Sequence, residues 1–220
     1  MRARIAELAG RHGRAAGSVQ LLAVGKRHPP EALAALAAAG QRHFGENYLQ
    51  EALAKQAALA DGAGELHWHY IGRLQSNKTR AVAECFDWVH TLDRLRLAER
   101  LSDQRPGDRP PLNVCLQVNQ GERGKGGVVP EALPELAAAI AELPALRLRG
   151  LMTLPDPAAD LAAQRQPFAA LRRMLEHLRS CGLALDTLSM GMSGDLEAAI
   201  AEGATWVRLG TALFGPRPAA

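Results

Sequence analysis

The 220-residue chain has little cysteine and few aromatic side chains. Its three cysteines, Cys85, Cys115 and Cys181, are far apart and form no CxxC pair, which argues against both a disulfide framework and a zinc site. The aromatic residues are three Trp, two Tyr and four Phe, and the 26 basic and 23 acidic residues are mixed without a basic run. We therefore expect no nucleic-acid partner, because such proteins combine a basic patch with stacking aromatic rings.

A long hydrophobic run is also missing. No stretch approaches the ~18 consecutive apolar residues of a membrane span. The opening residues 1–4 are charged, unlike a signal peptide. We therefore predict a cytoplasmic protein that makes no membrane contact. With 47% hydrophobic and 22% charged residues, the composition is that of a globular protein with a sizeable core.

Two kinds of segment alternate along the whole chain. Short runs rich in Val, Ile and Leu are followed by longer stretches in which apolar residues recur every three or four positions. The short runs predict eight strands, at 21–25, 42–45, 67–71, 88–91, 113–118, 147–152, 187–190 and 207–210. The longer stretches predict helices at 30–39, 47–60, 94–101, 130–142, 158–181 and 195–202, with a short one after Ser76.

One helix per strand predicts parallel strands, because helical crossovers join parallel neighbours. We expect a single α/β domain over residues 1–220, a (β/α)₈ TIM barrel in which the first ~16 residues form an extra N-terminal helix. A doubly wound open sheet is the alternative. In a parallel barrel the site lies at the carboxyl ends of the strands, so the polar residues that follow each apolar run are the candidates.

Lys26 ends the first predicted strand and is one of only four lysines, against 22 arginines. By contrast, Lys55 falls within a predicted amphipathic helix. Desolvation at a barrel mouth lowers the pKa of an amine, which leaves free amine to form an imine with a carbonyl. An exposed charge at the end of a strand is the alternative interpretation of Lys26.

Two glycine-containing segments follow the last two predicted strands, 189–195 and 210–215. The first runs through Ser193 into a helix, and the second begins with Gly210 and Thr211. Exposed N–H groups at a helix start favour an anion, and barrels frequently bind phosphate at these two positions. A simple turn with a helix cap is the alternative for each segment.

Arg208 lies within the last predicted strand, where a charge is costly unless it faces the site and finds an acceptor. Such a permanent cation donates to a ring nitrogen or a carboxylate, and a strand-end ion pair is the alternative. His67 and His69 share one face of a strand, as some metal ligands do. We expect packing or hydrogen-bonding imidazoles here and no metal. Met190 and Met192 are expected in the core or the pocket wall.

Five segments occur in the same order as in the pyridoxal 5′-phosphate (PLP) homeostasis protein family and closely resemble it: LAVGK (22–26), FGENY (44–48), HWHYIGRLQSNK (67–78), LSMGMS (188–193) and VRLGTALFG (207–215). That family resembles the barrel half of bacterial alanine racemase. The resemblance implies PLP as the cofactor, with an imine at Lys26. It also implies a ring nitrogen facing Arg208, a phosphate held by Ser193, Gly210 and Thr211, and a ring pocket lined by Asn47 and Met190.

Two features depart from the family pattern. Gly25 stands where the family usually has Ser or Thr before the lysine, and the segment 121–127 after the fifth strand is richer in glycine. Both bear on the rigidity of the pocket. Lys78 and Lys125 are candidates for a second, weaker contact to PLP or phosphate.

The residues also limit the chemistry. An arginine can only donate to the ring nitrogen, so the PLP ring is a weaker electron sink than one paired with a carboxylate. We see no counterpart of the second racemase domain, and neither Tyr48 nor Tyr70 occupies the place of its catalytic tyrosine. We therefore expect a PLP carrier, with no catalytic residue assigned, that passes PLP to amines of apo-enzymes or amino acids. A monomer is the family-like expectation.

Two enzymatic alternatives stay open. A PLP-dependent amino-acid racemase would use Lys26 as the base on one face of the ring and needs a second base on the other. A lysine-imine aldolase acting on a phosphosugar would explain Lys26 and the phosphate segments, but it leaves Arg208 without a ring nitrogen to meet.

Overall fold

The computed structural model describes residues 1–60, 62 and 64–215. The strands are β1 (Gln20–Val24), β2 (His43–Glu46), β3 (His67–Tyr70), β4 (Trp88–Leu92), β5 (Leu112–Gln117), β6 (Leu146–Met152), β7 (Thr187–Ser189) and β8 (Trp206–Leu209). The helices are α1 (Arg2–Arg11), α2 (Pro30–Ala38), α3 (Leu49–Leu59), η1 (Ser76–Lys78), α4 (Thr79–Cys85), α5 (Leu95–Gln104), η2 (Pro130–Ala132), α6 (Leu133–Ala141), α7 (Leu161–Ser180), α8 (Leu196–Ala201) and α9 (Thr211–Phe214), where η marks a 3₁₀ helix. Every predicted strand and helix is present, within a few residues of its expected bounds.

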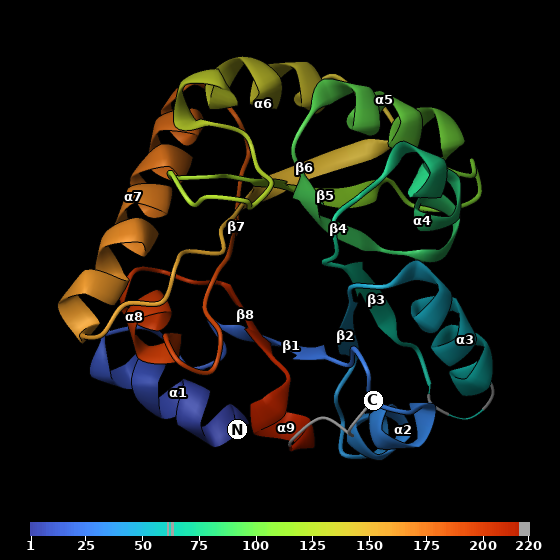
Figure 1. The fold of residues 1–220 in the computed structure, drawn as a ribbon, viewed down its shortest axis with the longest axis horizontal. Coiled ribbons are helices and arrows are strands. Elements are labelled where there is room, and N and C mark those ends of the chain that lie inside the picture. The colour runs from blue at the N-terminus through green and yellow to red at the C-terminus, as the bar shows by residue number, and fades with distance from the viewer. Residues whose placement is uncertain (61, 63, 216–220) are drawn as a thin grey trace.

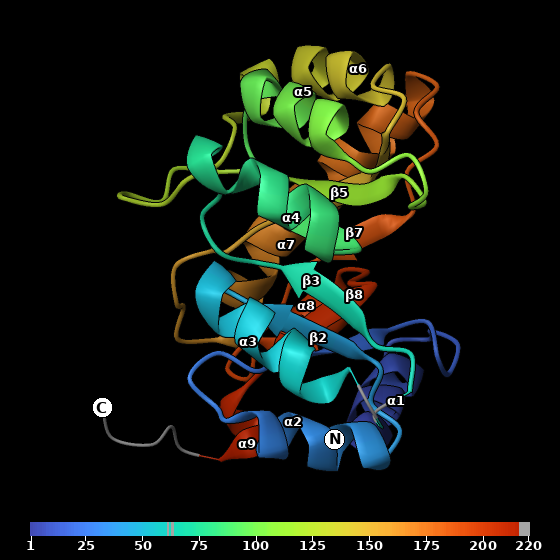
Figure 2. The same ribbon diagram turned by 90° about the vertical axis from the view of Figure 1, so that its right-hand side faces the viewer.

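The strands close into a barrel. They pair in chain order, all in parallel, and β8 returns to pair with β1. Figure 1 shows the helices as an outer ring around the strands, and Figure 2 shows the same barrel from the side. The predicted TIM-like barrel is therefore confirmed. The doubly wound alternative is wrong, because an open sheet would leave two edge strands unpaired.

The strands send alternate side chains to the two sides of the barrel wall, as strand geometry requires. Along β1, Leu21 and Ala23 belong to the large apolar core between the strands and the helices. Leu22 belongs to a separate, smaller cluster with Ile71 and Trp206. The same alternation in β8 places Val207 in the large core, so its neighbours Trp206 and Arg208 face the barrel interior.

The extra N-terminal helix predicted from the sequence is confirmed. Its residues Ile5, Leu8 and Ala9 recur at helical spacing and are buried, and α1 packs against α8. One helix was not indicated by the pattern. The four-residue α9 follows β8 directly, and it is too short to show an apolar periodicity.

The 20-residue α7 spans one side of the barrel, as the left of Figure 1 shows. The Asp160 carboxylate caps it by accepting the N–H of Ala163 at 2.8 Å. Its buried face consists of Phe168, Leu171, Leu175 and Leu178. Within the described ranges, no helix combines the length and the apolarity needed to cross a membrane.

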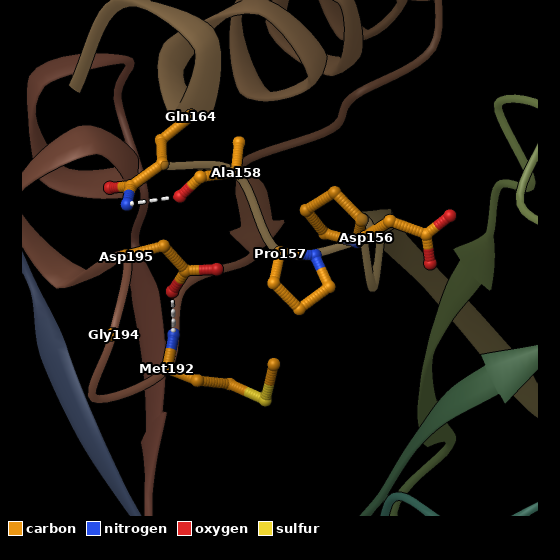
Figure 3. Close-up of a pocket in the computed structure, with 8 residues that line it drawn as sticks. Asp156, Pro157, Ala158, Gln164, Met192, Gly194 and Asp195 are labelled. Atoms are coloured by element: carbon orange, nitrogen blue, oxygen red, sulfur yellow. Dashed lines mark hydrogen bonds between the residues drawn. The ribbon is translucent and has the colours of Figure 1, made fainter. Parts of the chain in front are cut away.

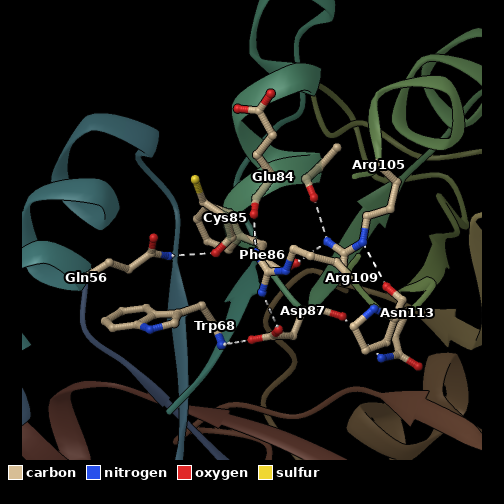
Figure 4. A network of polar contacts seen from close by, with 11 residues as sticks. Gln56, Trp68, Glu84, Cys85, Phe86, Asp87, Arg105, Arg109 and Asn113 are labelled. Atoms are coloured by element: carbon tan, nitrogen blue, oxygen red, sulfur yellow. Dashed lines mark hydrogen bonds and ion pairs between the residues drawn. The ribbon is translucent and has the colours of Figure 1, made fainter. Parts of the chain in front are cut away.

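Two arginines hold together the chain segments at the amino-terminal ends of β4 and β5 (Figure 4). Arg105 donates to the carbonyl oxygens of Ala83, Phe86 and Pro110, at 2.5, 2.7 and 2.9 Å. Arg109 pairs with Asp87 at 3.1 Å. The network lies at the end of the barrel opposite the strand carboxyl ends, where side chains usually serve stability.

Candidate functional site

A cavity of about 360 Å³ opens at the carboxyl ends of the strands. Six predicted site residues line this one cavity: Lys26, Asn47, Ser193, Arg208, Gly210 and Thr211. The other lining residues are Val24, Ile71, Met152, Leu154, Met192 and Gly194. These residues are far apart in sequence, and they meet because parallel strands end at the same edge of the barrel. The volume is that of a site for a small organic molecule.

Lys26 lies in the turn between β1 and α2. The turn is closed by the N–H of His28, which donates to the Gly25 carbonyl at 3.0 Å, and Arg27 adopts a left-handed conformation with a φ of 63°. Among the described residues, none forms an ion pair or hydrogen bond with the Lys26 ammonium. The amine therefore lines the cavity without a protein partner.

A buried lysine lies beneath this turn. The Lys55 ammonium donates to the Gly25 carbonyl at 2.7 Å, to Glu46 Oε1 at 2.7 Å and to Glu51 Oε1 at 2.6 Å. Burial raises the pKa of the Glu46 carboxyl to about 7, against the opposing effect of Lys55. Lys55 thus ties the residue before Lys26 to α3. The sequence gives no sign of this role of Lys55, because helical periodicity does not reveal which side chains a neighbouring turn covers.

Gly25 is closely packed in this structure. A β-carbon at this position would lie 2.6 Å from Glu46 Oε1 and 3.1 Å from two carbons of Leu33. Close packing with Glu46 and Lys55 therefore supports the turn where the family usually has Ser or Thr. The departure from the family pattern does not open a gap beside Lys26.

Backbone N–H groups and hydroxyls gather where the segments after β7 and β8 meet the cavity. Within the part of the chain that the structure describes, the N–H groups of Ser193 and Gly194 donate to no acceptor. Thr211 is the first residue of α9, and the first N–H groups of a helix have no partner within it. The arrangement suits an anion, as the sequence predicted for these segments.

Arg208 is buried, and its guanidinium lines the cavity. It donates through Nη1 to Ser189 Oγ at 2.9 Å and through Nη2 to the Thr153 carbonyl at 2.9 Å. No carboxylate of the described residues forms an ion pair with it, so the strand-end ion pair considered from the sequence is not present there. Burial lowers the pKa of this guanidinium to about 10. The Asp195 carboxylate opposes this shift in pKa without forming an ion pair. A buried cation that no carboxylate contacts suits a ligand that offers a lone pair.

Asn47 adds a second polar group that lacks a partner. Its Oδ1 is buried and has no hydrogen bond within the described chain, while its Nδ2 lies 3.5 Å from the Ile71 carbonyl. A buried polar atom left unpaired is costly, and such atoms often mark a place where a ligand or water binds. Asn47 lines the same cavity as Lys26 and Arg208.

The structure places Met190 apart from the other predicted residues. Its side chain is fully buried in the large core and does not line the cavity, whereas Met192 is 40% exposed and does. Ser189 faces the barrel interior toward Arg208, and the residue after it points to the helix side. Met190 therefore follows the expectation of a core residue, and its contact with a ring stays a prediction.

Neither additional lysine lines the cavity. Lys125 pairs with Asp156 at 2.7 Å and donates to the Leu154 carbonyl at 2.8 Å, which joins the loop after β5 to the loop after β6. Since Leu154 lines the cavity, this contact steadies the cavity rim. Lys78 is the last residue of η1. A phosphate contact by either lysine stays a prediction.

A second, smaller cavity of about 260 Å³ adjoins the first (Figure 3). Met192 and Gly194 belong to the walls of both. Asp195 Oδ1 accepts the N–H of Met192 at 2.5 Å, and Gln164 donates to the Ala158 carbonyl at 3.0 Å, as the dashed lines in Figure 3 mark. The first bond is internal to the segment after β7, and the second ties the start of α7 to the loop before it.

Three histidines bond to one another and a fourth packs against them, in agreement with the prediction of packing or hydrogen-bonding imidazoles at His67 and His69. His43 Nδ1 lies 3.0 Å from His69 Nε2, and His69 Nδ1 lies 2.9 Å from His90 Nε2. His67 stacks on His43 with ring centroids 4.7 Å apart. The sequence did not reveal that three strands supply one connected set of imidazoles, because this depends on the register between strands.

Comparisons with known proteins show the family and the fold of this chain. The family described as the N-terminal domain of alanine racemase matches residues 1–218. The chain is 62% identical to the pyridoxal phosphate homeostasis protein of Pseudomonas aeruginosa over 216 residues, which covers 98% of this chain and 92% of that protein.

Two solved structures are also similar. PipY from Synechococcus elongatus PCC7942, solved with PLP bound, is 43% identical with a TM-score of 0.85, over 96% of this chain and all of that chain. Alanine racemase from Corynebacterium glutamicum is 21% identical with a TM-score of 0.69, over all of this chain and 62% of that chain. The second likeness shows a shared fold.

Proposed function

Because this chain belongs to the pyridoxal phosphate homeostasis protein family, we propose that it binds PLP in the cavity at the strand ends and takes part in PLP homeostasis. One observation carries the proposal. A single cavity brings together a lysine whose ammonium has no protein partner, a buried arginine that forms no ion pair, and free backbone N–H groups, among the described residues. PLP presents an aldehyde, a ring nitrogen with a lone pair and a phosphate. The lysine amine, the arginine and the backbone N–H groups complement these three groups in that order.

The proposed roles follow from what each group can do. PLP supplies an electrophilic aldehyde, and the Lys26 amine is the nucleophile that holds it covalently and reversibly. Arg208 has only donors, so it binds a ring nitrogen that stays unprotonated. Ser193, Gly210 and Thr211 bind the phosphate with hydroxyl and backbone N–H groups. Asn47 would contact the ring between these two ends.

The cavity favours a carrier over a racemase. Among the lining residues within the described ranges, Lys26 and Arg208 are the ionisable ones, and a racemase needs an acid or base on each face of the ring. The Tyr70 hydroxyl donates to the Arg73 carbonyl at 3.2 Å, and its ring is buried in the large core. Tyr48 does not line the cavity. In the proposed role, the protein therefore holds and releases PLP without efficient catalysis.

Several predictions from the sequence form part of this proposal. Acceptors of PLP are amines on apo-enzymes or free amino acids, which attack the covalent link at the open mouth of the barrel. The whole chain acts as one cofactor-binding domain, as a monomer in the cytoplasm. The monomer is a prediction from the sequence. Measurement of the molecular mass in solution tests it, with the mass of one chain as the expected result.

The cofactor assignment is tested with Lys26→Ala. The purified wild-type protein, after addition of PLP, is expected to show an absorption band near the visible edge, and borohydride reduction followed by peptide mapping is expected to place the adduct on Lys26. The band and the adduct should vanish in Lys26→Ala and persist in Lys78→Ala, which removes a lysine outside the cavity. No band in the wild-type protein would overturn the assignment and favour a phosphosugar ligand.

The same preparation separates a carrier from an enzyme. We expect the loaded protein to transfer PLP to a PLP-requiring apo-enzyme and restore its activity. We also expect it to exchange the α-hydrogen of L-alanine no faster than free PLP does. Exchange well above that rate would contradict the carrier and establish a racemase.

A further inference from the structure

A continuous chain of hydrogen bonds runs through the barrel interior to Arg208. Arg208 Nη1 bonds to Ser189 Oγ at 2.9 Å, and Ser189 Oγ bonds to His90 Nδ1 at 2.7 Å. From His90 the chain continues through His69 to His43, at 2.9 and 3.0 Å. Its members come from β8, β7, β4, β3 and β2. Ser189, His69 and His90 are completely buried, so solvent does not complete or compete with these bonds.

The guanidinium sets the direction of every bond in the chain. It has donors only, so Ser189 Oγ accepts from Arg208. Among the described residues, the remaining partner of that hydroxyl is His90 Nδ1, and its proton must go there. If His90 donated from Nδ1 instead, the buried Ser189 proton would have no acceptor, which costs more than a hydrogen bond contributes.

The direction then passes from ring to ring. A neutral imidazole has one donor and one acceptor nitrogen. His90 accepts at Nδ1 and so donates from Nε2 to His69 Nδ1, and His69 in turn donates from Nε2 to His43 Nδ1. All three rings carry their proton on Nε2.

The environment keeps the three rings neutral. Burial, followed by the charge of Arg208, lowers the pKa of His90 to about 3. Burial also lowers the pKa of His43 to about 4, with a further contribution from His67. It holds the pKa of His69 well below its usual value, and the neighbouring imidazoles act in the same direction. At neutral pH each ring therefore has the donor and the acceptor that the chain requires.

We propose that Ser189 and His90 are positioning residues that fix the orientation of Arg208 for the ring nitrogen of PLP. The Ser189 hydroxyl accepts a hydrogen bond from Nη1, and the Thr153 carbonyl accepts one from Nη2. These two bonds fix the orientation of the planar guanidinium. Its remaining N–H groups then have no ion-paired carboxylate among the described residues, so they can donate to a ligand in the cavity. This inference rests on the proposed function, and it assigns the interior of the barrel a part in cofactor recognition.

The first test needs no cofactor. Histidine side chains labelled with ¹⁵N and ¹³C report their tautomer in solution by NMR, and assignment uses single-histidine variants. We expect His43, His69 and His90 to carry the proton on Nε2 at neutral pH. A proton on His90 Nδ1, or a cationic His90, would overturn the proposed direction of the chain.

The second test compares PLP with its analogue in which a C–H group replaces the ring nitrogen. Ser189→Ala and His90→Leu are expected to weaken PLP binding about tenfold, as the loss of one hydrogen bond to a charged group would. They should leave binding of the analogue nearly unchanged, since it has no ring nitrogen for Arg208. His90→Asn, whose amide can accept from Ser189 and donate to His69, is expected to retain most of the preference for PLP.

The control is Ser102→Ala, which removes another buried serine hydroxyl, one that accepts the N–H of Ala145 at 3.4 Å and lies away from the cavity. It should weaken neither ligand. Equal weakening of both ligands by Ser189→Ala would show a structural role only and overturn the positioning role. If the wild-type protein binds neither ligand, the proposed function itself fails.

Discussion

Lys55 illustrates how one residue supports the site without lining it. Its side chain is 3% exposed and that of Glu46 is completely buried, so the pair is shielded from solvent. Charges removed from water must be well paired, since the cost of desolvation is large. Lys55 satisfies this with two carboxylates and the Gly25 carbonyl, and it thereby holds the turn that carries Lys26.

Replacing Lys55 should destabilise the whole barrel. In Lys55→Ala the Glu46 carboxylate stays buried without its partner, and we expect the free energy of unfolding in urea to fall by about 3–5 kcal/mol. The control is Arg80→Ala, which breaks the exposed pair with Glu84, where the side chains are 69% and 43% exposed. That change should cost less than about 1 kcal/mol. Equal losses in the two variants would contradict the proposed importance of the buried cluster.

At the scale of elements, the connections after the strands place the functional groups. The connection from β7 to α8 turns sharply at Gly191, whose φ is 97°, so that Ser193 and Gly194 reach the cavity. A β-carbon at Gly191 would lie 2.5 Å from the β-carbon of Ala199 in α8. Glycine is required here both by the backbone conformation and by the close approach of the helix.

Gly191→Ala and Gly203→Ala separate these two requirements. Gly203 has nearly the same φ, 96°, but a β-carbon there would meet its nearest neighbour, the flexible Arg172 side chain, at 3.4 Å. Both substitutions strain the backbone. The free energy of unfolding should fall by about 1–3 kcal/mol more in Gly191→Ala than in Gly203→Ala, because the added methyl group overpacks the contact with α8. Urea unfolding of both proteins measures the difference. Indistinguishable losses would mean that the helix contact yields at little cost.

At the scale of the whole molecule, the barrel interior is unusually polar. Imidazole and indole rings pack together there, with His69 stacked on Trp88 at 5.4 Å and Trp206 in contact with His43 at 4.8 Å between ring centroids. TIM barrels more often fill this space with branched aliphatic side chains. Here hydrogen bonds connect the imidazoles on β2, β3 and β4, through Ser189, with Arg208 at the cavity.

This interior should make the protein sensitive to acid. Burial lowers the pKa of His43 to about 4 and of His90 to about 3, from 6.5. Below about pH 6.5 the unfolded chain therefore binds protons that the folded chain does not, and the free energy of unfolding falls as the pH falls toward 3. Urea unfolding at a series of pH values should show this slope reduced in His90→Asn. The exposed His177→Asn should keep the wild-type slope, and an unchanged slope in both would count against the expectation.

Much of the fold and of the site could be predicted before any coordinates. The spacing of apolar residues predicts the alternation of strands and helices, because this spacing depends only on residues close together in sequence. The barrel, in turn, determines that residues following the strands share one face. The place after an apolar run therefore indicates Lys26, Ser193, Gly210 and Thr211. Arg208 is indicated instead as a charge within the last strand, between Val207 and Leu209.

Other features depended on which strands lie side by side and in what register. His90 and Ser189 are 99 residues apart, and their hydrogen bond exists only because the barrel closes. The sequence predicts only that Lys55 lies in an amphipathic helix. In the folded chain its ammonium is buried beneath the turn at Gly25 and donates to the Gly25 carbonyl. Met190 packs in the core because the strand alternates its side chains, and its contact with a ring stays a prediction. Local spacing determines the elements, whereas burial and hydrogen bonding between distant strands are settled only when the chain closes on itself.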